Sequence, residues 1–435
     1  MMAQALRNRF PSTPGAPGRL LRCLLAPAAV VLPWMLSGAV LAADASGFIY
    51  GKVTTERGTE FTGRMRWGGE ETFWGDFFNS RKTDRGIPRD VMRKSSRGER
   101  RDGIRVFGYK INIRGKASDT RLFKARFGDI QMIRPRGGDH VTVLMRDGRE
   151  MDLDGGSNDI GAKITVHDEA LGEATVPWDT IDKIEFMGAP RSVSVDVTRL
   201  YGTVRTSDGE FTGYIQWDQD ECLSSDELDG TSRDAELSLA MGSLASIERR
   251  SSKSSEVVLK DGRSFILSGS NDVDDDNRGI FIENDEVGRV LVPWDEFRKV
   301  TFKRAPGSGP DYDSYGSAAE LRGKVTTLDG DVAEGRLFYD LDEAGTWEIL
   351  DGNRYDIEYS IPFELIARVE PKSGGSSKIT LRSGRELILA DGVDVGDGND
   401  GVLILEGPDR STYVPWREID TVEIRRRWRN EPEHR

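Results

Sequence analysis

The stretch VLVPWDEFRKV, residues 290–300, has two close relatives elsewhere in the chain. These are ATVPWDTIDKI at residues 174–184 and TYVPWREIDTV at residues 412–422. In each, an apolar residue follows the Trp at the third position and a β-branched residue at the sixth. The Pro marks the end of a strand, because it cannot donate a hydrogen bond to a sheet. Three such phrases indicate an internal duplication.

Relaxing the Pro reveals three further copies between these phrases. They are ARFGDIQMI at 125–133, LAMGSLASI at 239–247 and IPFELIARV at 361–369. The bulky residues of the six copies are, in order, Phe127, Trp178, Met241, Trp294, Phe363 and Trp416. We predict that each of them plugs one end of a small β-module.

A glycine turn precedes each copy. The turn glycines are Gly58, Gly148, Gly209, Gly262, Gly330 and Gly384. Their distance to the bulky residue is 30 to 33 residues in five units and 69 in the first. Such a turn between alternating apolar residues predicts a β-hairpin, because Gly tolerates positive φ. Two features in register predict six modules, each with a hairpin and three further strands.

The predicted fold class is therefore all-β, with no long helix after the N-terminal segment. The six small five-stranded barrel-like modules group into three tandem repeats, at 48–189, 200–305 and 321–428. The first repeat carries a basic insertion at about 79–106, and residues 429–435 are predicted to be a disordered tail.

A one-turn corner before the last strand resembles Sm-like and Src-homology-type barrels. The resemblance lies in the closing phrase and implies topology only. Pro293 and Trp294 stand where the Sm family has Arg-Gly, so the family's residues tied to RNA contact are missing here. No functional residue is carried over.

The N-terminal residues 1–42 look like a secretory signal peptide. Four Arg precede or flank an apolar run that ends in small residues at Val40 to Ala42. An uncleaved membrane anchor is the alternative, and would be the chain's one membrane contact. We predict a periplasmic or secreted protein. The 61 basic residues against 74 acidic ones oppose binding to nucleic acid, since backbone phosphates would be repelled.

The inventory of catalytic residues is small. The chain has three His and two Cys, and Cys23 would leave with the signal peptide. Cys222 lies among acids, which should raise the pKa of its thiol. We find no phosphate loop, nucleophile elbow or dinucleotide motif in a fitting context. A non-catalytic protein is favoured, although two acids at the right separation would suffice for a hydrolase.

A calcium loop is the best metal candidate. Asp272, Asp274 and Asp276 occupy its positions 1, 3 and 5, and Glu283 occupies position 12. Asn277 stands where the loop requires Gly. The alternative is a solvated loop between strands.

The first repeat also carries aromatics followed by a basic stretch, which predicts a docking surface for a partner. The candidate residues are Trp67, Trp74, Phe77, Phe78, Arg81, Arg93, Arg100 and Arg101. The alternative is that the aromatics belong to the core and that the basic stretch is a disordered loop.

These observations predict an exported non-catalytic binding or scaffold protein of the cell envelope, without a cofactor, whose partner is a protein or an envelope glycan. A calcium-responsive binding protein and a carboxylate-dependent hydrolase are the alternatives.

Overall fold

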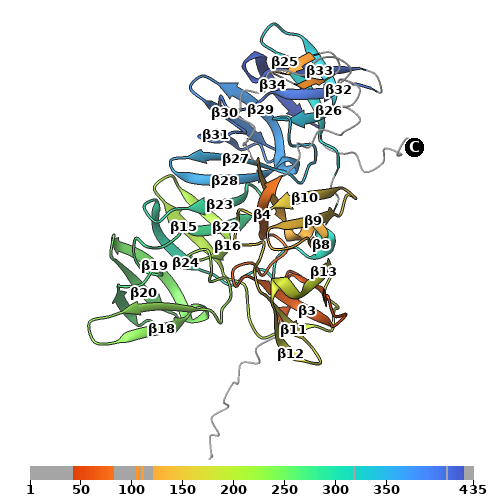
Figure 1. The fold of residues 1–435 in the computed structure, drawn as a ribbon. Coiled ribbons are helices and arrows are strands. Elements are labelled where there is room, and N and C mark those ends of the chain that lie inside the picture. The colour runs from red at the N-terminus through yellow and green to blue at the C-terminus, as the bar shows by residue number, and fades with distance from the viewer. Residues whose placement is uncertain are drawn as a thin grey trace, which may run out of the picture. The chain divides into compact units, whose positions relative to one another are not determined.

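The computed structural model describes residues 43–82, 104–106, 109–111, 121–316, 319–407 and 410–425. The predicted signal peptide, most of the basic insertion with Arg93, Arg100 and Arg101, and the predicted tail lie outside these residues. Within them the chain is all-β, as predicted, with antiparallel sheets and 3₁₀ turns of three residues (Figure 1).

One sheet has ten antiparallel strands, in the order β12-β11-β3-β2-β13-β8-β9-β10-β4-β7. We call these strands, residues 50–186, the first series. They are β2 (Tyr50–Thr55), β3 (Glu60–Trp67), β4 (Phe77–Lys82), β7 (Arg121–Arg126), β8 (Ile130–Pro135), β9 (His140–Met145), β10 (Glu150–Asp154), β11 (Ile164–Asp168), β12 (Gly172–Val176) and β13 (Ile181–Phe186).

The second series, residues 201–302, pairs in the order β23-β22-β16-β15-β24-β19-β20-β21. This order corresponds to the first eight places of the first series. β17 and β18 pair with each other, and Thr231 at the end of β17 bridges to Ser268, just after β21. The strands are β15 (Tyr201–Thr206), β16 (Glu210–Gln216), β17 (Glu227–Thr231), β18 (Glu236–Ala240), β19 (Leu244–Ser251), β20 (Ser254–Leu259), β21 (Ser264–Leu267), β22 (Ile280–Asn284), β23 (Gly288–Val292) and β24 (Phe297–Phe302).

The third series, residues 322–424, pairs in the order β33-β32-β26-β25-β34-β29-β30-β31-β27-β28. β28 also pairs with β23, which joins this series to the second. The strands are β25 (Arg322–Thr327), β26 (Val332–Tyr339), β27 (Ile349–Arg354), β28 (Ile357–Pro362), β29 (Ile366–Lys372), β30 (Ser376–Leu381), β31 (Glu386–Ala390), β32 (Val402–Leu405), β33 (Ser411–Val414) and β34 (Ile419–Ile424).

Two short pairs complete the strands. β1 (Ala43–Asp44) pairs with β14 (Ser194–Val195), and β5 (Ile104–Val106) pairs with β6 (Tyr109–Ile111). None of the sheets formed by the described strands closes into a barrel.

The strand pairing corrects the prediction of modules that are each built from one continuous stretch. A self-contained first module would pair β3 with β4 and β2 with β8. Instead β3 pairs with β11 and β2 with β13, whereas β4 pairs with β10 and β8 with β9. In the first series, each glycine-turn hairpin thus pairs with two of the strands that follow the other hairpin. The third series shows the same exchange, and the second shows it with the Thr231 bridge in place of one ladder.

A pair of glycines lies where the first hairpin of each series crosses its partner strands. The cross-strand pairs are Gly51 with Gly63, Gly202 with Gly213, and Gly323 with Gly335. A Cβ on Gly213 would overlap the backbone carbonyl oxygen of Glu283 in β22, and the other five glycines face a backbone carbonyl in the same way. Glycine is required here because a third strand lies against the hairpin backbone.

The bulky residues of the repeated phrase lie at the corners before the last strands, where all six are buried. Five of them begin a 3₁₀ turn, namely η1 (Phe127–Asp129), η2 (Trp178–Thr180), η3 (Met241–Ser243), η5 (Phe363–Leu365) and η6 (Trp416–Glu418). In the first and third series, two corner residues pack against the aromatic residue at the end of the first hairpin. Ring centroids of Phe127 and Trp178 lie 5.2 and 5.8 Å from that of Trp67. Tyr339 receives Phe363 and Trp416 at 5.1 and 5.8 Å.

Candidate binding site

Each series brings a largely buried glutamate, which lies just after the first hairpin, close to an aspartate in the loop after the second hairpin. The glutamate lies four residues after the hairpin's terminal aromatic and forms an antiparallel bridge with it. The pairs are Glu71 with Asp159, Glu221 with Asp272, and Glu343 with Asp394.

Hydrogen bonds from the surrounding fold position each aspartate. The hairpin aromatic donates to the backbone oxygen of the aspartate: Trp67 to Asp159 and Trp217 to Asp272 at 2.9 Å, and Tyr339 to Asp394 at 2.7 Å. The carboxylates of Asp159, Asp272 and Asp394 also accept the backbone N–H of Asn79, Asp229 and Asp351 at 2.6, 2.6 and 2.7 Å. The aspartate is therefore held by both the hairpin and the strand next to it.

The glutamates lack such partners. The Oε2 atoms of Glu71, Glu221 and Glu343 are buried and accept no hydrogen bond from the part of the chain that the structure describes. Burial, followed by the charge of Asp272, raises the pKa of Glu221 to about 8. Burial also raises the pKa of Asp272 to about 6, although the hydrogen bond from the backbone N–H of Asp229 lowers it. The pKa of Glu343 is raised well above its ordinary value by burial and by nearby acids.

The pair of the third series lies on the wall of a cavity of about 750 Å³. Among the described residues, nine carboxylates and three basic side chains line it, together with apolar and polar residues of β7, β27 and β28. The acids are Asp340, Asp342, Glu343, Glu348, Asp351, Glu358, Asp391, Asp394 and Asp400. We call this the acidic cavity.

The three basic side chains of the acidic cavity all form ion pairs. Lys82 lies 3.2 Å from Asp342 and 3.1 Å from Glu348. Arg121 lies 2.6 Å from both Asp340 and Asp400, and Lys124 lies 2.9 Å from Asp351. Within the described residues this leaves four acids of the cavity without an ion pair, namely Glu343, Glu358, Asp391 and Asp394, so the cavity favours a cationic ligand.

The predicted docking aromatics are core residues in the structure. Trp67, Trp74 and Phe78 are fully buried, and Phe77 is 7% exposed. The rings of Trp67, Trp74 and Phe78 pack on other aromatic rings of the core, which are those of Phe127, Phe186 and Tyr312. Arg81, the one described arginine of the prediction, is exposed in β4.

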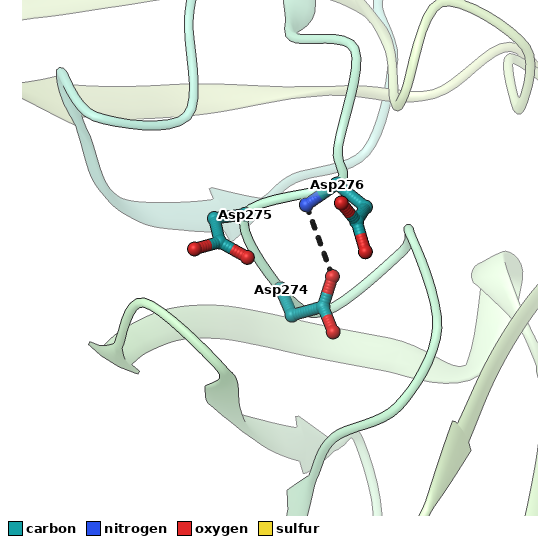
Figure 2. Close-up of side chains that lie close together, drawn as sticks. All are labelled: Asp274, Asp275 and Asp276. Carbon is teal, nitrogen blue, oxygen red and sulfur yellow. Dashed lines mark hydrogen bonds between the residues drawn. The ribbon is translucent and has the colours of Figure 1, made fainter.

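The predicted calcium ligands do not converge. Asp272 belongs to the pair with Glu221, and Glu283 in β22 forms an ion pair with Arg199 at 2.6 Å. Asp274 and Asp276 do lie together, with Asp275, on one loop, where the Asp276 N–H donates to Asp274 at 3.1 Å (Figure 2). Lys253 contacts Asp275, and Asp275 and Asp276 are exposed.

The isolated thiol of Cys222 is buried. Burial, more than the neighbouring acids, raises its pKa to about 12, although Arg66 opposes the shift. A thiol in this state is a poor nucleophile at neutral pH.

Comparisons with protein-family models, with curated proteins and with solved structures find no match to this chain. In the part of the chain that the structure describes, no helix has the length and apolar character needed to cross a membrane. The assignment of a site thus depends on geometry.

Sequence reasoning missed the carboxyl pairs, although a signal for them exists. The glutamate follows the last aromatic of the hairpin by four residues in WGGEE, WDQDE and YDLDE. The aspartate stands before Ile or Val in NDI, NDV and VDV. These segments are far apart in the chain, and only the exchanged strand pairing brings them together.

The free energy of unfolding is expected to fall as pH rises because of the buried pair of Glu221 and Asp272. The folded Glu221 keeps its proton up to about pH 8, whereas the unfolded side chain loses it near pH 4.5. Between these pH values unfolding releases a proton, so the stability that Glu221 contributes decreases as pH rises. Above about pH 8 this contribution no longer changes with pH. Glu221→Gln should therefore gain stability relative to the native chain between pH 5 and 8. Urea unfolding across this range measures the difference.

Glu210→Gln is the matched control for this prediction, because Glu210 is exposed at the start of β16. Its difference from the native chain should stay constant with pH. Parallel pH profiles for Glu221→Gln and Glu210→Gln would contradict a protonated Glu221.

Proposed function

We propose that the chain is an exported, non-catalytic binding or scaffold protein of the cell envelope, and that its acidic cavity holds a basic segment of a protein partner. The observation that carries the proposal is the excess of carboxylates in a cavity of about 750 Å³. A basic segment would place Lys or Arg beside acids that have no cation of their own, and charge complementarity would steer its approach.

The proposed architecture is three tandem repeats, each with two five-stranded barrel-like modules that exchange hairpins. Its support is the correspondence of the strand orders in the three series. The one-turn corner before each last strand also supports a resemblance to Sm-like and Src-homology-type barrels. A scaffold is in keeping with this architecture, since repeated modules multiply the surface without adding catalytic groups.

A glycan partner and a hydrolase have less support. A neutral glycan would leave the excess negative charge of the cavity uncompensated. A carboxylate hydrolase needs two acids that face the substrate. Glu343 is only 7% exposed, and one carboxylate oxygen of Asp394 already accepts the N–H of Asp351.

Binding of a labelled Lys-rich peptide to the chain without residues 1–42 tests the proposal. Glu358 and Asp391 are exposed at the cavity, so Glu358→Gln combined with Asp391→Asn should spare the fold. We expect the dissociation constant, measured by fluorescence anisotropy, to rise about fivefold, since each lost charge pair costs roughly 0.5–1 kcal/mol. The affinity of the native chain should also fall with added salt.

The control is Asp179→Asn combined with Asp182→Asn, which removes the same charge from exposed positions at η2 and β13. Equal weakening by both double variants would show that net charge alone attracts the peptide. That result, or equal affinity for a Glu-rich peptide, would overturn the proposal.

A further inference from the structure

We infer that Asp340, Glu343 and Asp394 form a calcium site on the inner wall of the acidic cavity. One carboxylate oxygen from each of the three lies within 4.8 Å of the others. A single ion can touch all three, because Ca²⁺ binds oxygens at about 2.3–2.6 Å. The three residues come from the loop after β26 and the loop after β31, so tertiary structure assembles the site.

The state of Glu343 points independently to a ligand. Its side chain is 7% exposed, and its buried Oε2 has no hydrogen-bond partner within the described residues. An ionised carboxylate buried without a partner is costly, whereas a bound cation would compensate it. The carboxylate also lines the acidic cavity, which offers a route for the ion.

The basic residues nearby leave this charge unbalanced. Arg121 is shared by Asp340 and Asp400, and Lys82 is shared by Asp342 and Glu348. No ion pair of the described part of the chain involves Glu343 or Asp394. Binding one divalent cation would offset these two carboxylates, and Asp340 would remain a ligand through a lone pair that Arg121 does not use.

The ligand set selects the kind of cation. Three carboxylates are hard oxygen ligands, and the group contains no His or Cys, so soft metals are disfavoured. Mg²⁺ at about 2.0–2.1 Å would require a tighter group and near-ideal octahedral geometry. Ca²⁺ tolerates the irregular arrangement and completes its shell with water from the cavity.

The other two series lack the complete set. Gly68 stands in the first series where the third has Asp340. In the second, Asp218 accepts hydrogen bonds from Asn271 and from the backbone of Arg278, and its carboxylate does not group with those of Glu221 and Asp272. One calcium ion per chain is therefore expected.

Calorimetric titration of Ca²⁺ into the isolated chain, without any partner, tests this inference. We expect one site, and an increase in melting temperature with Ca²⁺. Tb³⁺ as a second probe should show sensitised emission, since Trp347 lines the same cavity and Tyr339 bonds Asp394. Ca²⁺ should compete with that emission. Because no peptide is present, failure here is distinguishable from failure of the proposed function, with which the site shares a cavity.

Two variants locate the ion. Glu343→Gln combined with Asp394→Asn should lower the affinity at least a hundredfold, because it removes two of the three carboxylates that would bind the ion. Asp274→Asn combined with Asp276→Asn, on the loop shown in Figure 2, should bind Ca²⁺ like the native chain. The inference is overturned if the native chain gives no heat and no thermal shift, or if only the loop variant loses the ion.

Discussion

Replacing Lys82 with Met is expected to lower the free energy of unfolding by about 3–5 kcal/mol, the usual cost of removing one partner from a buried ion pair. Lys82 in β4 is 8% exposed and is held between Asp342 and Glu348. Burial alone would lower the pKa of Lys82, but these two carboxylates hold it above its ordinary value. Urea unfolding at pH 7 measures the loss.

Of the two acids that Lys82 pairs with, Asp342 loses more of its compensation in Lys82→Met, because Glu348 has other partners. Glu348 keeps Arg149 at 3.3 Å and two backbone N–H donors at 2.7 Å. Among the described residues, the one ion pair that Asp342 would keep is with the distant Arg121 at 3.9 Å. Asp342→Asn in the Lys82→Met background should therefore recover part of the stability.

Lys52→Met is the control, since Lys52 also lies in a strand and pairs with Glu60 at 3.0 Å, but both are solvent-accessible. Its expected cost is much smaller than that of Lys82→Met, because exposed ion pairs contribute little to stability. A Lys82→Met cost no greater than that of Lys52→Met would show that the Lys82 pairs are not buried in solution.

Gly213→Ala is expected to cost about 3 kcal/mol, at the upper end of the range for overpacking. The new Cβ would overlap the carbonyl oxygen of Glu283, which is backbone and cannot rotate away. The ladder between β16 and β22 would have to separate locally. Denaturant unfolding of the variant measures the cost, and Gly63→Ala and Gly335→Ala should behave alike, because the overlaps are equivalent.

Gly138→Ala provides the comparison, because a Cβ there meets no atom within 4 Å and the backbone needs no positive φ. We expect a change of less than about 0.5 kcal/mol. If Gly213→Ala were equally neutral, β22 would not lie against β16, and the exchanged pairing of the second series would be wrong.

The candidate site was only partly predictable from sequence. Asp272 lies among several acids, and this pattern predicts a continuous loop of ligands rather than a pair with a distant glutamate. Glu343 and Asp394 are separated by about fifty residues, and nothing local in the sequence connects them. The sequence also leaves the location of Trp67 and Phe78 open, since an aromatic residue beside acids fits a core and a surface equally well.

The sequence by itself determined the all-β class, the six turns and the six corners. A hairpin depends on a turn and its neighbouring residues, and a Pro-aromatic corner depends on one short segment, so both can be read locally. Only the tertiary structure decided which hairpin pairs with which strands. Because all six copies carry nearly the same local signals, pairing within a module and pairing with its neighbour are indistinguishable in sequence. Side-chain packing distinguishes the two pairings, because Trp67 contacts both Phe127 and Trp178. The same packing brings the carboxyl pairs together.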